Sequence, residues 1–316
     1  MTDYSIQLQY NPPVSNIAQF CQHGFFFNEP AHLCQQSDGP FYLLTALNQR
    51  TGLTEARCAF FPNADKAVSP IAAPFGSIEF ADTLPEPTLD AFLKALITAV
   101  QSIGTFARLQ LTNYPACYAP SQASRLVTKL SEHGFQIIQT NPTFYLATKS
   151  DFAQAFAPAE RRRLRKCREA GFQFQQCASH EVLNVVRFLY ETRRQQGYTL
   201  TIAPAKLEKL LQTFPEQFPV FTVTDGPKLA ALTVAVRVRE DILYTFLPAS
   251  HPDYRTFSPM VMLTDGLVSY GRERNIRLLD LGTSLDENQL PKLSLMRFKR
   301  NLGARESPKL VFEKCF

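Results

Sequence analysis

The sequence predicts an α/β (α+β) fold made of two related domains in tandem, over residues 1–150 and 151–316. A chain of 316 residues is longer than one hydrophobic core usually fills, so about two domains are expected. The order strand, loop, helix, strand, helix, glycine, strand also occurs twice, at an offset of about 165 residues and without residue identity between the copies. A single large mixed sheet whose units merely look alike remains the alternative.

Charge is shared unequally between the two halves. Residues 1–150 hold 8 Lys and Arg against 10 Asp and Glu, a net charge of −2. Residues 151–316 hold 25 against 18, a net charge of +7. An anionic partner is therefore expected for the second half.

The composition, with 45% hydrophobic and 19% charged residues, is typical of globular proteins. No apolar run approaches the roughly 18 residues that span a bilayer, and the N-terminus lacks a signal-like pattern, so a cytoplasmic location is expected. The seven cysteines include no Cys-x-x-Cys pair, which predicts free thiols rather than disulfides or zinc ligands. The histidines form no pattern typical of a metal enzyme or a Ser-His-Asp hydrolase, so no metal is expected.

In the first half, apolar residues from Leu89 to Val100 recur at helical spacing and predict an amphipathic helix that ends at Gly104. A second helix is expected over residues 121–132 and a short one over residues 15–23.

Apolar runs predict the strands of the first half. They cover residues 41–47, 56–61 and 108–111, with a hairpin turn at Thr51-Gly52 between the first two. A strand over residues 69–80 is expected to be interrupted at Pro74 and Gly76 by a bulge or a close backbone approach. Gly134 is expected to begin a strand pair that runs to Ala147.

The second half begins after a short linker, expected over residues 152–158. A helix over residues 160–170 then carries six basic residues that encircle it, so some must face solvent or a partner. The later elements are expected as strands over residues 242–247, 277–281 and 309–313, a helix over residues 259–274, and a helix that ends at Gly303.

Two stretches of this half resemble the Fem-type and BioF2-type acyltransferases of the GNAT superfamily. Leu279-Asp-Leu-Gly282, followed by Phe298-Lys299 and Gly303, is similar to the family's strand ending in Asp-Leu-Gly and its Phe-Lys-x-x-x-Gly helix. The basic run from Arg161 to Gly171 is similar to the helix and glycine that open the acyltransferase half. The resemblance implies two tandem GNAT-like domains, each a mixed, mostly antiparallel sheet flanked by helices, of which the first is degenerate or binds the acceptor.

In GNAT folds, the helix after a splayed strand presents backbone N–H groups to the pyrophosphate of an acyl-CoA, because helix N-termini favour anions. The resemblance assigns the equivalent donor-binding turn to five residues: Tyr254, Arg255, Ser258, Pro259 and Met260. Ser258 suits the N-cap, Pro259 the first helical position, and Arg255 a charged contact. An ordinary capped helix is the alternative, since no glycine lies between Tyr254 and Val261, where the family's turn has glycines.

Asp280 and Glu79 are the acids best placed to act as a base, because each stands at or near a predicted strand end, where a carboxylate can equally cap a loop. Tyr244 is a candidate donor to a thiolate or an oxyanion. The resemblance puts Lys299 at the substrate cleft, where it would meet negative charge; a surface lysine is the alternative. Glu79 and Lys299 are also candidate substrate contacts, and the resemblance adds two more: Arg165 and Phe298.

The resemblance therefore implies an acyltransferase that moves an acyl or aminoacyl group from acyl-CoA, such as acetyl-CoA, or a similar anionic donor to an amine. The resemblance suggests a small molecule, an amino sugar, a peptide or a cell-envelope precursor as the acceptor. The alternative is a non-catalytic binding module for a nucleotide-sugar or a protein partner, which the missing turn glycines favour. Nucleic acid is not expected as a partner, except as an aminoacyl-tRNA donor, because the basic helix lacks interleaved aromatics.

Overall fold

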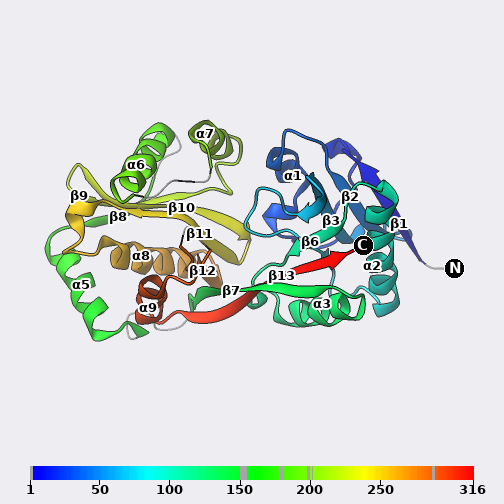
Figure 1. The fold of residues 1–316 in the computed structure, drawn as a ribbon. Helices are drawn as coiled ribbons and strands as arrows, with labels where there is room; N and C mark the ends of the chain where they lie inside the picture. The colour runs from blue at the N-terminus through cyan, green and yellow to red at the C-terminus, as the bar shows by residue number, and fades with distance from the viewer. Residues whose placement is uncertain (1–2, 150–154, 178–180, 198–199, 201, 287–288) are drawn as a thin grey trace. The chain divides into compact units, whose positions relative to one another are not determined.

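The computed structural model describes residues 3–149, 155–177, 181–197, 200, 202–286 and 289–316. The chain forms two compact units, one of residues 1–142 with 307–316 and one of residues 143–306. Each unit is a mixed, mostly antiparallel sheet with helices packed on it (Figure 1), as the sequence predicts.

In the first unit the strand order is β1-β2-β3-β4-β6-β13-β7, with β5 paired to β3. Its strands are β1 (Tyr4–Tyr10), β2 (Tyr42–Asn48), β3 (Thr54–Asn63), β4 (Lys66–Ser69), β5 (Glu79–Phe80), β6 (Arg108–Thr112) and parts of β7 (Gln136–Ala147) and β13 (Arg305–Cys315). Its helices are α1 (Pro30–Gln36), α2 (Glu86–Ile103) and α3 (Pro120–Glu132). Strand β4 runs parallel to β6, whereas β2 and β3 are antiparallel.

Helices α2 and α3 confirm the two longer helices predicted for the first half. The apolar face of α2 is buried, and Gly104 ends the helix in the left-handed conformation. The predicted helix over residues 15–23 is wrong, because only a 3₁₀ turn forms there, at Val14–Asn16. The following backbone pairs with β3 instead: Thr54 N donates to Gln19 O and Cys21 N donates to Thr54 O. This long-range pairing outweighs the local helical spacing.

Two strand predictions in the first unit need correction. The interrupted strand over residues 69–80 is two separate strands, β4 and β5, because Pro70 and Pro74 cannot donate to a ladder. The expected close approach is present, since a Cβ on Gly76 would lie 2.9 Å from Pro70 N. The expected strand pair after Gly134 is one continuous strand, β7, which runs straight through Pro142.

Strands β7 and β13 each run from one unit into the other. The compact units divide at Pro142/Thr143 within β7 and at Glu306/Ser307 within β13. Residues 143–147 pair with β12, and residues 311–315 pair with β6. The division therefore differs from the expected boundary at 150/151, and the last ten residues belong to the first unit. The linker expected over residues 152–158 lies partly outside the described residues.

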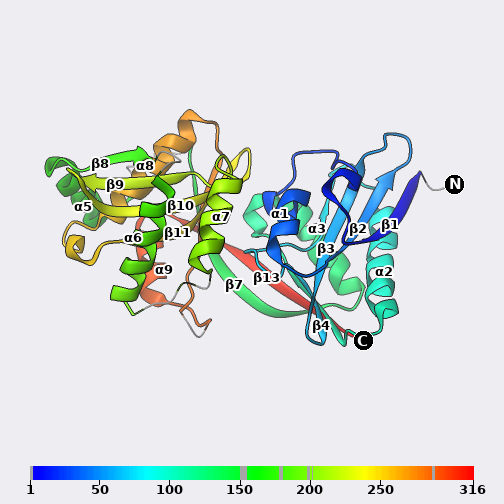
Figure 2. The same ribbon diagram turned by 90° about the horizontal axis from the view of Figure 1, so that it is seen from above.

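In the second unit the strand order is β7-β12-β11-β10-β9-β8. Its further strands are β8 (Gln173–Gln176), β9 (Val220–Asp225), β10 (Lys228–Arg239), β11 (Ile242–Ser250) and β12 (Leu278–Thr283). Its helices are α5 (Pro158–Glu169), α6 (Val182–Gln195), α7 (Pro204–Thr213), α8 (Pro259–Glu273) and α9 (Leu293–Asn301). Helices α6 and α7 cover one face of this sheet, and α8 covers the other (Figures 1 and 2).

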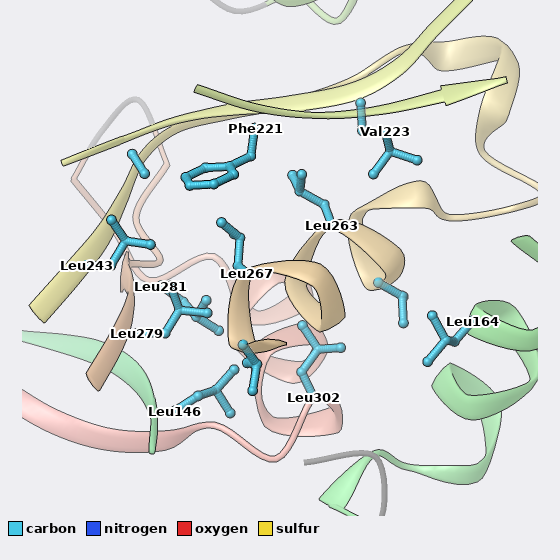
Figure 3. Packing of buried hydrophobic residues seen from close by; sticks show 14 of the residues in the cluster. Leu146, Leu164, Phe221, Val223, Leu243, Leu263, Leu267, Leu279, Leu281 and Leu302 are labelled. Atoms are coloured by element: carbon cyan, nitrogen blue, oxygen red, sulfur yellow. The ribbon is translucent and has the colours of Figure 1, made fainter. Parts of the chain in front are cut away.

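The core of the second unit lies between α8 and the sheet. Leu263 and Leu267 of α8 point toward Phe221 of β9 and Leu279 of β12 (Figure 3), and all four are almost completely buried. Their spacing along α8 matches the helical repeat, so one stripe of the helix enters the core. Each such leucine contributes about 1.5–3 kcal/mol on burial, so this packing holds α8 firmly under the strands.

The two units repeat one arrangement. In the first, β4 and β6 are parallel neighbours with α2 between them in sequence, followed by α3 and β7. In the second, β11 and β12 are parallel neighbours joined through α8, followed by α9 and β13. The repeated pattern of the sequence therefore corresponds to two related α/β units.

Gly266 provides a test of how closely α8 packs on the sheet. A Cβ at this position would lie 2.3 Å from Cγ of Phe174, although alanine is normally the better helix former. We expect Gly266→Ala to lower the free energy of unfolding by about 1–3 kcal/mol, measured by urea denaturation followed by circular dichroism. Ser269→Ala, on the exposed side of α8, should change it by less than about 0.5 kcal/mol. Equal stability of both variants would contradict the packing.

Candidate active site

Strands β11 and β12 separate soon after they meet. They pair in parallel over only three residues each, Ile242–Tyr244 against Leu278–Asp280. Beyond this point β11 contains an extra residue relative to β10, between Thr245 and Leu247. Such a bulge bends the strand that carries it, so β11 turns away from β12.

Asp280 shapes the end of β12. Its side chain is 2% exposed, and Oδ1 accepts a hydrogen bond from Gly282 N at 2.6 Å. Gly282 has φ of 72°, and a Cβ there would lie 3.0 Å from the Tyr244 ring, so only glycine fits without strain. On the other side, Thr245 Oγ1 donates to the carbonyl of Asp280 at 3.0 Å.

Lys299 of α9 reaches the same strand end. Its Nζ donates to the carbonyl oxygens of Gly282 at 2.9 Å and Thr283 at 2.8 Å, and the residue is 6% exposed. Burial lowers the pKa of Lys299 from its usual 10.5 to about 8, while the charge of Asp280 acts in the opposite direction. The amine is therefore partly neutral near physiological pH.

The buried side of α9 includes a charged residue. Met296, Lys299 and Leu302 are buried, whereas Leu293 is 72% exposed. The helix therefore presents Lys299 inward together with two apolar residues. Phe298, a candidate substrate contact, is half-buried against the core of the unit.

Tyr244 completes the group at the strand end, because it is the register partner of Asp280. Burial, and then the charge of Asp280, raise the pKa of Tyr244 well above its usual value. Its phenol therefore stays protonated at neutral pH and can donate a hydrogen bond. The structure thus brings together Asp280, Lys299 and Tyr244, the three catalytic candidates of the sequence.

The start of α8 has an unusual cap. Ser258 occupies the N-cap and Pro259 the first helical position, as predicted, but the Ser258 side chain makes no capping hydrogen bond. Ser258 also has φ of 55°, a left-handed conformation that glycine adopts most easily. The chain therefore makes this turn with a serine in a conformation that a side chain disfavours. The N–H groups of the first turn are left without a side-chain cap.

The turn before α8 is held from two sides. Tyr254 Oη donates to Asp225 Oδ2 at 3.2 Å, and its ring packs edge-on against Phe172. Lys166 of the basic helix α5 donates to the carbonyl of Thr256 at 3.2 Å and lies over the Phe257 ring. One of the six basic residues thus contacts the turn.

The remaining donor-site candidates surround this turn. Arg255 is exposed, and Met260 is half-buried against the core. Arg165 is 70% exposed, and its nearest ionic partner is the equally exposed Glu169 at 3.6 Å. A pair this exposed contributes little to stability.

Glu79 belongs to the first unit, whereas Asp280 belongs to the second. It is 4% exposed and accepts hydrogen bonds from Phe25 N at 2.7 Å, Asn28 Nδ2 at 3.2 Å and Arg57 Nε at 2.9 Å. These contacts correspond to the loop-capping alternative considered for a carboxylate at a strand end. The sequence analysis did not single out Arg57, although a charged residue inside an apolar strand was a usable signal.

Sequence reasoning also missed Thr245. Its hydroxyl bonds the Asp280 carbonyl where the two strands part, and a lone threonine between two aromatic residues was the only local sign of it. Among the described residues there is no cluster of His, Cys, Asp and Glu side chains that could hold a metal. No helix in the described part of the chain is long and apolar enough to cross a bilayer.

The lowered pKa of Lys299 makes stability depend on pH. Because the folded-state pKa, about 8, lies below the unfolded value of 10.5, the unfolded state binds more protons between these values. The contribution of Lys299 to the free energy of unfolding is therefore fully present above pH 10.5 and is lost as pH falls through about 8. We expect the free energy of unfolding of the wild type, minus that of Lys299→Met, to rise by about 2–3 kcal/mol from pH 7 to pH 10 in urea titrations. A constant difference would show that Lys299 titrates normally.

Comparison with known proteins identifies the fold. Residues 159–300 match the family described as "Acetyltransferase (GNAT) domain". No curated protein sequence matches the chain. The crystal structure of FemX is similar with a TM-score of 0.68 and 12% identity, covering 93% of each chain. The C-terminal domain of a putative lysylphosphatidylglycerol synthetase from Agrobacterium fabrum has a TM-score of 0.57 and 11% identity, covering 82% of this chain and 80% of that one.

A tandem GNAT protein from the clavulanic acid biosynthesis pathway has a TM-score of 0.53 and 11% identity, covering 98% of both chains. At such identities the structures speak for the fold alone. They nevertheless agree with the family match and with the repeated β-α-β arrangement of the two units. Residues 159–300 therefore match a GNAT acetyltransferase domain, and the chain has the fold of FemX and of the tandem GNAT protein.

Proposed function

We propose that this protein is an acyltransferase that moves an acyl or aminoacyl group from an anionic, activated donor to an amine. The observation that supports this most is the grouping of Asp280, Tyr244 and Lys299 where β11 and β12 part, within a GNAT domain. All three are at least half-buried, where hydrogen bonds and charges act more strongly than in water.

Each of the three has a distinct proposed role. An amine must lose a proton as it attacks the acyl carbonyl, and the Asp280 carboxylate accepts that proton. Tyr244, kept neutral by its raised pKa, donates a hydrogen bond to the oxyanion or to the leaving group. Lys299 holds the β12 end in place and offsets the negative charge that develops on the acyl oxygen.

The reaction then needs no covalent bond to the enzyme. The acceptor nitrogen forms a bond to the acyl carbon, and the carbon–sulfur or carbon–oxygen bond to the donor breaks. The amine proton passes to Asp280, and the electron pair leaves with the donor's sulfur or oxygen. Direct attack of this kind depends on holding both substrates together, which the rigid strand ends favour.

The proposed donor contact is the start of α8. Its uncapped N–H groups and the nearby Arg255 suit an anionic group such as a diphosphate. The Cβ of Ser258 keeps the backbone less close to a phosphate than a glycine would. Acyl-CoA is the first proposed donor, since the solved structure of the similar tandem GNAT protein is described as one "without AcCoA". An aminoacyl donor such as aminoacyl-tRNA is the second, in line with the name of the similar synthetase.

The acceptor is proposed only as an amine, on a small molecule, an amino sugar, a peptide or a cell-envelope precursor. A non-catalytic binding module is the second candidate function, and the left-handed Ser258 favours it. A thermal-shift screen with acetyl-CoA, other acyl-CoAs, aminoacyl-tRNA and nucleotide-sugars separates the two, because a ligand that binds only the folded state raises its stability. Stabilisation by nucleotide-sugars alone would favour the binding module.

Removing the charge of Lys299 tests the proposed chemistry. Lys299→Met keeps most of the side chain's packing but loses both carbonyl contacts and the charge, so kcat/KM should fall about a hundredfold with the donor and acceptor that the screen identifies. Arg297→Met, at an exposed position on the same helix, should leave it unchanged. Near-normal turnover of the folded Lys299→Met protein would remove this lysine from the mechanism.

Arg255 tests the proposed donor contact. Arg255→Ala should weaken binding of the phosphate-bearing donor by about 1–3 kcal/mol in calorimetry, because a charge-assisted contact is lost. Arg161→Ala, which removes an equally exposed charge from α5, is the matched control and should bind as the wild type does. Equal donor affinity in all three proteins would place the donor elsewhere.

A further inference from the structure

A cavity of about 670 Å³ opens in the second unit near the end of β8. One wall is apolar and comes from helices α6 and α7, the segment before β9 and the first residue of β9: Val182, Val185, Leu211, Phe218 and Val220. The polar side is formed mainly by Arg237, Tyr270 and Arg274. The volume is that of pockets that bind small organic molecules.

The cavity forms because the outermost strand is short. Strand β8 has four residues, and its ladder continues for one more bond, from Cys177 N to Val220 O at 2.8 Å. Past that point the segment before β9 runs beside β10, where Arg237 N donates to Gln217 O at 2.7 Å. The outer side of this segment has no paired strand in the described part of the chain.

Arg237 is the notable group in this cavity. Its Nε is buried and has no hydrogen-bond partner among the described residues. Glu216 also lines the cavity, but it is exposed and forms no ion pair with Arg237. A buried guanidinium donor without a partner is costly, and such groups usually pair with a carboxylate or a phosphate.

The second arginine adds to the positive charge. Arg274 lies over the Tyr270 ring at 4.2 Å, and its distance to Glu273 is 4.0 Å, at the limit of an ion pair. The cavity therefore joins two guanidinium groups to an apolar wall. This combination suits a molecule with one anionic end and one apolar end.

The cavity is distinct from the proposed donor contact. Tyr270 lies in the last turns of α8 and Arg274 directly follows the helix, whereas the donor contact is at its first turn. With 15 residues in α8 and a rise of about 1.5 Å per residue, roughly 17–22 Å of helix separate the two. None of Tyr244, Asp280 and Lys299 lines the cavity.

We propose that this cavity binds a small carboxylate with an apolar body, independently of the acyl-transfer site. The carboxylate pairs with the Arg237 guanidinium, whose planar fork matches its two oxygens. The apolar body lies against Val185 and Leu211. Acetate leaves most of the cavity unfilled, whereas a medium-chain carboxylate fills it.

Calorimetry on the full chain with octanoate tests the proposal. The wild type should bind one octanoate, and should bind acetate more weakly, because the apolar wall is then unused. Arg237→Met should weaken octanoate binding about tenfold or more. Arg187→Met is the matched control: it removes the same charge from the exposed side of α6, the helix that lines the cavity, and should bind normally. Lys299→Met should also bind octanoate normally, which separates this site from the proposed catalytic group.

Two further measurements distinguish loss of the binding site from loss of folding. Without octanoate, Arg237→Met should be as thermally stable as the wild type or more so, because an unpaired buried donor is removed. Val185→Trp, which fills the cavity, should abolish octanoate binding. Absence of wild-type binding at millimolar octanoate would overturn the proposal, as would equal binding by Arg237→Met. Much tighter binding of phenyl phosphate than of octanoate would overturn the carboxylate assignment.

Discussion

The contact between Lys299 and the end of β12 is the interaction on which the site depends. A buried ammonium is costly, and here two backbone carbonyls and the charge of Asp280 offset that cost in part. The remaining cost appears as the lowered pKa. In return, Gly282 and Thr283 are held from α9, and Asp280 holds Gly282 from within the strand. Hydrogen bonds from Lys299 and to Asp280 thereby fix the end of β12, and the Tyr244 ring packs against Gly282.

Two other places also contain an energetically unfavourable feature. Ser258 takes an unfavourable left-handed backbone conformation at the start of α8. Its side chain does not cap the helix, so the first-turn N–H groups receive no hydrogen bond from it. The Nε atom of Arg237, on β10, is buried and has no hydrogen-bond partner among the described residues. Unpaired polar groups and unfavourable backbone angles concentrate at binding sites, because a bound ligand supplies the missing contacts. Both features suit anionic ligands. Ser258 is at the start of α8, and the cavity lined by Arg237 lies near its end, at Tyr270 and Arg274.

Much of the architecture was readable from the sequence because it follows from local patterns. The spacing from Leu89 to Val100 specifies an amphipathic helix, and the residues from Leu279 to Gly282 mark a buried strand with a turn at its end. The family resemblance also singled out Asp280 and Lys299, and in the structure both lie at the end of β12. The misjudged segment at residues 15–23 and the separation of β4 from β5 depend on pairing with distant residues, which no local window contains.

The fold class, the doubled β-α-β arrangement and the residues of the β12 end could be predicted from the sequence, since each follows from hydrophobic period or from a short motif. The course of β7 through Pro142 into the second unit, the inward direction of Lys299 and the unpartnered, buried Nε of Arg237 among the described residues became visible in the folded structure. The physical reason is that burial and strand pairing are set by contacts between segments far apart in the chain. Such contacts fix which side of α9 is covered and where β8 stops, and the pKa of Lys299 and the cavity beside Arg237 follow from them.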